Sequence, residues 1–175
     1  QGTIDGAFNA PSELTSIRLI DVATDITVNM PGGTVHGLDV MSVNRDFWKS
    51  LSDDERRAYM ESAALGNAAT TWKFMNDVET NLEQAREKGI AIHEASPEML
   101  ATSDAAIEAD LANIATLAKD TYGIDDAETK IARFRELVTK WEGLVPQDRD
   151  WTAEEIAEIY RAEIFSKLDP ATYGM

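Results

Sequence analysis

The sequence predicts an α/β protein in which helix predominates. Short segments rich in alternating or β-branched residues are confined to the first 47 residues and to residues 90–93. Elsewhere, apolar residues recur at steps of three and four, which is the period of an amphipathic helix. Glycine and proline separate the short segments, as expected of turns between strands. We therefore expect a small amount of strand supported by several helices.

Composition narrows the classes of protein to which the chain can belong. Its 175 residues are 43% hydrophobic, enough to fill the core of one sizeable domain or two small lobes. The net charge is −16 and there is no basic cluster, so we expect no nucleic-acid partner. There is no cysteine for a disulfide, a thiol nucleophile or Cys-ligated zinc. No apolar run approaches the roughly 18 to 20 residues that span a bilayer.

The N-terminal quarter of the chain is predicted to contain strands and one helix. Thr3–Phe8, with glycines inside and before it, is typical of a brief strand. Pro11–Thr24 is predicted to be helical, since proline suits a first turn. Asp25–Met30 alternates polar and apolar residues as a strand does. Leu38–Val43, beyond the break at Pro31–Gly33, is again strand-like.

A long helix is predicted near the middle of the chain. A short helical piece, Arg45–Leu51, precedes it, and Ser52 with Glu55 forms a capping box at its start. The helix should run to about Lys88 and end at Gly89. About 35 residues would reach roughly 50 Å, which exceeds the diameter of a small domain. Such a helix must either bend or cross from one body to another.

The C-terminal half is predicted to hold one strand, Ile90–His93, followed by three helices. These cover Ser96–Tyr122, Asp125–Trp141 and Thr152–Leu168, the last with a second capping box at Thr152 and Glu155. The apolar residues expected to face inward are Ile107, Leu111, Ile114, Ala118 and Tyr122, then Ile131, Phe134, Val138 and Trp141, then Ile156, Tyr160 and Ile164. Among the tryptophans, Trp48, Trp72 and Trp141 are expected in the core, and Trp151 as a hydrophobic staple.

The sequence offers little support for catalysis. Its two histidines, His36 and His93, have no partner at the spacing of a metal site. No phosphate-binding loop, dinucleotide fingerprint or nucleophile elbow is present. Paired acids stand at helix starts, where they favour the helix dipole. We expect no catalytic residue, metal or cofactor. A cryptic enzyme using His36 with Asp39 is a third possibility, after the two considered below.

Asn9 and Phe8 are the first candidates for contact with a ligand. Asn9 follows a predicted strand end, and such ends open onto clefts in α/β folds. Its amide has donors and an acceptor that suit a carboxylate or hydroxyl, and Phe8 would wall the pocket. The alternative is an ordinary Asn turn before Pro11.

The loop around Gly33 and Thr34 is the second candidate. It leads to His36 between two extended segments, where the imidazole would donate to an anionic ligand. A solvent-facing loop histidine is the alternative. His93, by contrast, is expected to be an ordinary residue at a strand edge.

Several segments, in this order, resemble one family. They are Gln1–Gly6, then Asn9 near a proline, Val43-Asn44, the Phe47–Ser52 segment, and Lys88–Ile90 before a strand. Together they resemble the DctP family, the solute-binding proteins of tripartite ATP-independent periplasmic (TRAP) transporters. The resemblance covers nearly the whole chain, through the order and spacing of these segments.

The resemblance implies a periplasmic-binding-protein-like fold of two α/β lobes, which close over a small organic acid and are spanned by a long helix. Residues 1–37 and 77–175 would belong to the second lobe, and residues 38–76 to the first. The protein would be a periplasmic monomer that delivers its ligand to the TRAP membrane permease subunits, without catalysis or a membrane span of its own.

The resemblance also places the ligand contacts. The family's ligand-contacting asparagine corresponds to Asn9, Phe8 is a frequent contact, and Gly33, Thr34 and His36 would border the cleft. The family's carboxylate-binding arginine would lie upstream of Gln1. We therefore expect the 175 residues to be the C-terminal portion of a longer protein, so the lack of a signal peptide says nothing about location. The alternative is an acidic helical protein-interaction module, formed by residues 97–168, without a transport role.

Overall fold

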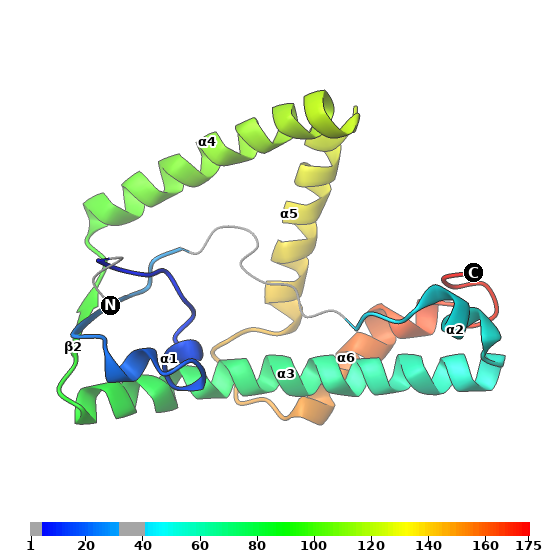
Figure 1. Cartoon of the computed structure of the whole chain (residues 1–175), viewed down its shortest axis with the longest axis horizontal. Helices are drawn as coiled ribbons and strands as arrows, with labels where there is room; N and C mark the ends of the chain where they lie inside the picture. The colour runs from blue at the N-terminus through cyan, green and yellow to red at the C-terminus, as the bar shows by residue number, and fades with distance from the viewer. Residues whose placement is uncertain (1–4, 32–40) are drawn as a thin grey trace. The chain divides into compact units, whose positions relative to one another are not determined.

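The computed structural model describes residues 5–31 and 41–175, and helices predominate among them (Figure 1). The chain divides into two compact units. Described residues 5–31 and 81–146 form the first unit, and residues 41–80 and 147–175 form the second. The expectation of a helix-rich chain with a small sheet is confirmed.

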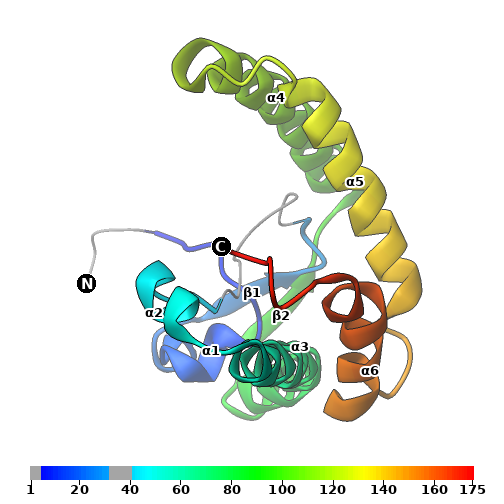
Figure 2. The ribbon, with the colours of Figure 1, turned by 90° about the vertical axis from the view of Figure 1, so that its right-hand side faces the viewer.

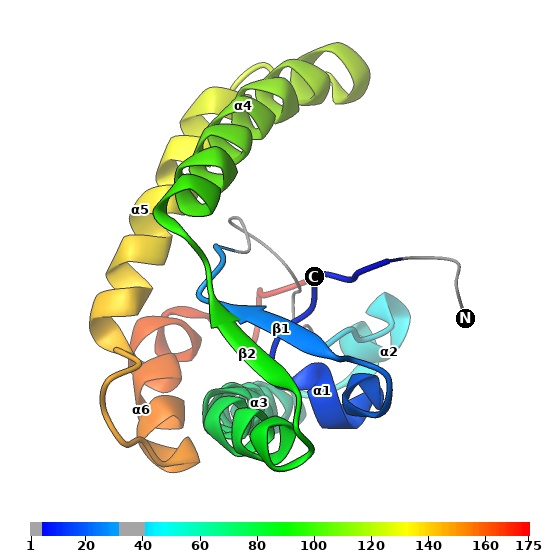
Figure 3. The same cartoon turned by 90° about the vertical axis from the view of Figure 1, so that its left-hand side faces the viewer.

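The sheet belongs to the first unit and has two strands in the described part of the chain. Strand β1 (Asp25–Val28) pairs in parallel with β2 (Ala91–Glu94), with Ile26 opposite Ile92 (Figure 3). Asn29 follows β1 with φ of 56°, and its side-chain oxygen accepts a hydrogen bond from the Ala95 amide at 2.9 Å. Both of these strands were predicted from the sequence.

Two other predicted strands are not found in the described residues. Residues 5–8 of the predicted strand Thr3–Phe8 have no regular structure, and residues 3 and 4 lie outside the described residues. A strand needs a neighbouring backbone to pair with, and in the described part of the chain β1 and β2 pair only with each other. Of the predicted strand Leu38–Val43, residues 41–43 have no regular structure and the rest are not described.

The predicted helix Pro11–Thr24 is replaced by two short pieces. Helix α1 (Glu13–Ser16) ends after one turn, and a 3-10 turn, η1 (Leu19–Asp21), follows it. Between them Arg18 has φ of 61°, a left-handed conformation that stops an α-helix. Asp21 accepts hydrogen bonds from Arg18 and Lys88, both at 2.7 Å, and these two cations lower the pKa of its carboxyl.

Helix α3 (Asp53–Glu87, 35 residues) confirms the predicted long helix. At its start the Glu55 amide bonds the Ser52 hydroxyl at 3.3 Å, and the Glu55 carboxylate accepts from the Ser52 amide at 2.8 Å, which completes the capping box. At its end Gly89 has φ of 81°, the conformation of a C-terminal glycine cap. The helix begins in the second unit and ends in the first, since the units divide after Thr80.

Helices α4 (Pro97–Tyr122) and α5 (Ala127–Leu144) have the predicted bounds to within a few residues and are joined through Gly123 (Figure 1). The guanidinium of Arg135 bonds both carboxylate oxygens of Glu108, at 2.9 and 3.2 Å. The expected inward face is wrong in part. No residue of α4 is buried, and 43% of Ile114 and 71% of Tyr122 are exposed. On α5, Phe134 is also exposed.

The second unit is built on α3. Helix α2 (Arg45–Ser50) is capped by Asn44, whose side chain accepts from the amides of Asp46 and Phe47. Helix α6 (Ala153–Glu163) lies beside α3 (Figure 2), and the hydroxyls of Thr71 and Tyr160 are 2.8 Å apart. A 3-10 turn, η2 (Phe165–Lys167), follows α6 where helix was expected to continue to Leu168.

Only some of the residues predicted to lie in the core of the second unit are buried. Ile156 on α6 is fully buried and Trp48 on α2 is buried, as expected. Trp72, however, is 38% exposed, which corrects its assignment to the core. Its indole N–H donates to the main-chain oxygen of Trp151 at 2.7 Å, and this hydrogen bond holds the ring at the surface. Ile164 is likewise exposed.

Candidate functional site

The segment with Phe8 and Asn9 lies exposed before helix α1 in the first unit. Phe8 is 55% exposed. The Asn9 amide donates to the carboxylate of Glu13 at 2.9 Å, and the Ala10 amide donates to the same oxygen at 3.3 Å. The oxygen of the Asn9 side-chain amide accepts no hydrogen bond from a described residue, so it is available to accept one from a ligand hydroxyl.

A buried asparagine on α3 fixes this segment from below. Asn81 is 3% exposed, and its side-chain N–H groups donate to the main-chain oxygens of Pro11 and Ser12 at 3.1 and 3.0 Å. The hydroxyl of Thr15 donates to its side-chain oxygen at 3.0 Å. Each buried polar atom of Asn81 therefore has a partner, and the backbone after Asn9 is held to a long helix.

The structure does not describe the other predicted ligand contacts. Gly33, Thr34 and His36, together with Asp39, lie outside the described residues. His93 has an exposed side chain at the edge of β2, as expected, and its Nε2 lies 2.8 Å from the Asp25 carboxylate. This hydrogen bond lowers the pKa of Asp25.

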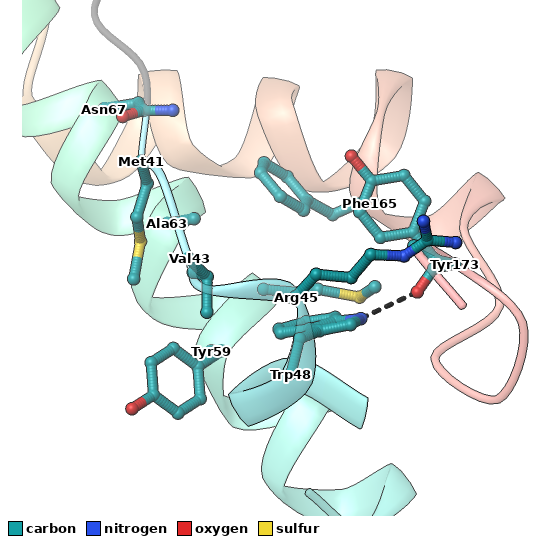
Figure 4. A pocket seen from close by; sticks show the side chains of 11 residues that line it. Met41, Val43, Arg45, Trp48, Tyr59, Ala63, Asn67, Phe165 and Tyr173 are labelled. Carbon is teal, nitrogen blue, oxygen red and sulfur yellow. Dashed lines mark hydrogen bonds between the residues drawn. The ribbon is translucent and has the colours of Figure 1, made fainter. Parts of the chain in front are cut away.

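A separate cavity of about 410 Å³ opens in the second unit. Its described lining comes from the segment before α2, from α2 and α3, and from η2 and the chain after it (Figure 4). The lining residues are Met41, Val43, Arg45, Trp48, Tyr59, Met60, Ala63, Asn67, Phe165, Tyr173 and Gly174. Apolar and aromatic side chains predominate, which is the usual lining of a small-molecule site.

Trp48 is the fixed wall of this cavity. Its indole N–H donates to the main-chain oxygen of Tyr173 at 2.7 Å (Figure 4). Its ring meets those of Tyr59 and Tyr173 edge to face, with centroids 6.3 and 6.4 Å apart. Behind it, the buried guanidinium of Arg56 bonds the main-chain oxygens of Trp48 and Pro170. The aromatic wall is thus held in one orientation before any ligand arrives.

Sequence reasoning missed the cavity, although it singled out part of its lining. Trp48 was expected in the core, but Arg45, Asn67 and Phe165 were not expected to contact a ligand. A usable signal existed for Arg45: it lies three residues before Trp48 on one short helix, and residues at that spacing share a face.

Within residues 5–31 and 41–175, no group of three or more His, Asp or Glu side chains is arranged to hold a metal ion. None of the described helices combines the length and the apolar character that crossing a bilayer requires.

Comparison with known proteins gives one match. The family model DctP, described as bacterial extracellular solute-binding protein, family 7, matches residues 1–117. The matched residues make up about two thirds of the chain, including the Asn9 segment, α2, α3 and the sheet. No curated protein and no solved structure matches.

Proposed function

Because this chain belongs to the DctP family of bacterial extracellular solute-binding proteins, we propose that it captures a small organic acid in the periplasm and delivers it to the permease of a TRAP transporter. Members of this family are periplasmic binding proteins rather than enzymes. The match over residues 1–117 is the observation that carries the proposal.

The proposed fold is the two-lobe architecture of periplasmic binding proteins, with residues 1–37 and 77–175 in the second lobe and residues 38–76 in the first. Ligand capture then works by lobe closure. Hydrogen bonds to the ligand favour the closed state, and the permease recognises that state. The length of α3, whose residues belong to both compact units, is consistent with a helix that links two bodies.

In this proposal Asn9 orients the ligand and Phe8 covers it, while Gly33, Thr34 and His36 border the cleft. The exposed position of Phe8 and Asn9 supports the first part, because a solute can reach both side chains. The anchor at Asn81 supports it too, since a ligand contact works best on a backbone that is already ordered.

A thermal-shift screen tests the proposal. The protein is heated with dicarboxylates, sugar acids, sulfonates and aromatic acids, and each stabilising compound is then titrated by calorimetry. A compound present at 100 times its Kd should stabilise the protein by about 2.7 kcal/mol. If no organic acid in these four classes raises the melting temperature, the proposal fails.

Two substitutions then separate ligand contact from local order. Asn9→Ala removes the amide and should weaken solute binding about tenfold, the effect of one lost hydrogen bond at the upper end of its range. Glu13→Ala removes the partner of Asn9 but keeps the amide, so binding should persist. Asn113→Ala, at an exposed site on α4, is the matched control. Equal binding by all three variants would exclude Asn9 as a contact.

The alternative, an acidic interaction module, is supported by the exposed apolar residues of α4, where Ile114 is 43% and Leu117 is 53% exposed. Trp72 and Phe134, which would join one patch on this hypothesis, belong to different compact units. A variant with Ile114→Glu and Leu117→Glu should lose any protein partner and keep solute binding. If both substitutions leave every protein complex intact, this alternative is wrong.

A further inference from the structure

We propose that the cavity in the second unit is a binding site for a small molecule with an apolar, aromatic body and one anionic head group, separate from the Asn9 segment. This proposal rests on the cavity alone and not on the function proposed above. The supporting features, taken from the described residues, are the preformed apolar wall, one cation at its edge, and an amide that has no hydrogen-bond partner among those residues.

The wall is preorganised for an aromatic ring. Trp48 is fixed by a hydrogen bond to the main chain and by edge-to-face contacts with Tyr59 and Tyr173. Met60 and Phe165 complete an apolar lining around it. A flat ring entering this space displaces water from apolar surface without requiring the wall to rearrange.

Arg45 selects the charge of the occupant. It is the only charged residue among the described residues that line the cavity, in a chain whose net charge is −16. One N–H of its guanidinium donates to the main-chain oxygen of Met175 at 2.9 Å. The remaining N–H groups have no partner among the described residues. No Asp or Glu side chain belongs to that described lining, so an anionic head group gains a charge-assisted hydrogen bond here.

Asn67 supplies a second polar contact. Its side chain is half-buried and lines the cavity from α3, and its amide has no hydrogen-bond partner in the described part of the chain. Figure 4 shows Asn67 and Arg45 at different edges of the cavity, with the apolar side chains between them. A ligand with its ring between these edges would place an anion at Arg45 and a polar substituent toward Asn67.

The volume limits the occupant to a small molecule. About 410 Å³ lies near the lower end of the range for ligand pockets, roughly 300 to 1,000 Å³. A single ring with a short acidic arm fits this class, whereas a folded segment of another protein does not. The probe we choose is 3-phenylpropionate, and 3-phenylpropan-1-ol is its neutral counterpart.

Calorimetric titration of both probes tests the site. The parent chain should bind the acid at least tenfold more tightly than the alcohol. Arg45→Met removes the cation and keeps a chain of similar length, so it should weaken acid binding about ten- to a hundredfold and leave the alcohol unchanged. Ala63→Leu fills part of the cavity and should weaken both probes. Arg57→Met, an exposed arginine outside the cavity, makes the same charge change and should bind as the parent does.

The other outcomes would overturn the proposal. Equal binding of acid and alcohol would mean that Arg45 selects nothing, and no heat from either probe at millimolar concentration would mean that the cavity is not a site. If Asn9→Ala weakens acid binding as much as Arg45→Met does, the acid binds at the Asn9 segment instead. By contrast, the proposal is supported if Asn9→Ala leaves binding of 3-phenylpropionate unchanged while Arg45→Met weakens it. Melting curves of every variant identify any loss of folding.

Discussion

Arg56 is expected to be the most sensitive single position in the second unit. The residue is 5% exposed, and its guanidinium joins three parts of the chain. It donates to the main-chain oxygens of Pro170 at 2.7 Å, Leu51 at 2.5 Å and Trp48 at 3.3 Å. It also meets the carboxylate of Asp53 at 2.5 Å. Arg56→Met would remove all four contacts while keeping much of the apolar volume.

The loss of folding stability expected for Arg56→Met follows from these contacts. The Asp53 side chain is 60% exposed, so its ion pair with Arg56 is screened and contributes little. Each of the three carbonyl bonds comes from a charged donor and contributes about 1.5 kcal/mol at the low end of the usual range. Their sum agrees with the roughly 3–5 kcal/mol lost when one partner of a buried charged network is removed. We therefore expect Arg56→Met to destabilise the unit by about 3–5 kcal/mol.

Urea unfolding followed by tryptophan fluorescence measures this loss, since Trp48 reports on the same network. Arg57→Met is the control, because Arg57 is exposed and its removal should cost less than about 0.5 kcal/mol. Amide hydrogen exchange should also quicken in residues 169–175, which Arg56 holds through Pro170. If Arg56→Met and Arg57→Met unfold at the same urea concentration, water satisfies the three carbonyls and the reasoning is refuted.

Three further substitutions probe local features. Asn81→Leu should cost about 2 kcal/mol and speed proteolysis of residues 9–16, because two main-chain oxygens lose their buried partner; unchanged proteolysis would contradict this. Gly123→Ala should cost about 1 kcal/mol in urea unfolding, since φ of 64° disfavours a residue with a Cβ, and no loss would show that the turn relaxes. The backbone amide of Thr152 lowers the pKa of Glu155, so the carboxylate stabilises the fold above its unfolded pKa and loses this effect as pH falls through the lower, folded value. The difference in melting temperature between Glu155→Gln and the parent should therefore shrink in acid, and a constant difference would rule out this linkage.

The features that sequence predicted well are those whose cause is local. Both capping boxes join atoms three residues apart, so Ser52 with Glu55 and Thr152 with Glu155 are readable from spacing. Gly89 and Gly123 end helices because they accept a left-handed backbone that other residues resist. Strands β1 and β2 were also predicted, and in β1 the alternation of polar and apolar residues matches an alternation of exposed and half-buried side chains.

The failures have nonlocal causes. The Asp5–Phe8 segment has strand-like residues, but a strand forms only against a partner, and the pattern carries no information about the partner. Arg18 breaks a segment whose apolar period suggested one helix, and its turn is supported by Asp21, which also reaches Lys88 from the end of the long helix. The inward face expected on α4 requires a neighbour to cover Ile114, and the period of a helix does not supply that neighbour.

The second-unit cavity shows how much of a site can be inferred from sequence. Asn44 caps α2, which fixes Arg45 in its first turn and Trp48 one turn later on the same face. Trp48 was correctly expected to be buried, so a cation at the edge of a buried aromatic surface could have been predicted from the sequence. The contributions of Asn67 and Phe165 could not be predicted in this way. These residues lie on α3 and η2, and they follow Arg45 by 22 and 120 residues in the sequence. The charge preference of this cavity is thus encoded within one short helix, whereas its shape depends on the packing of the whole unit.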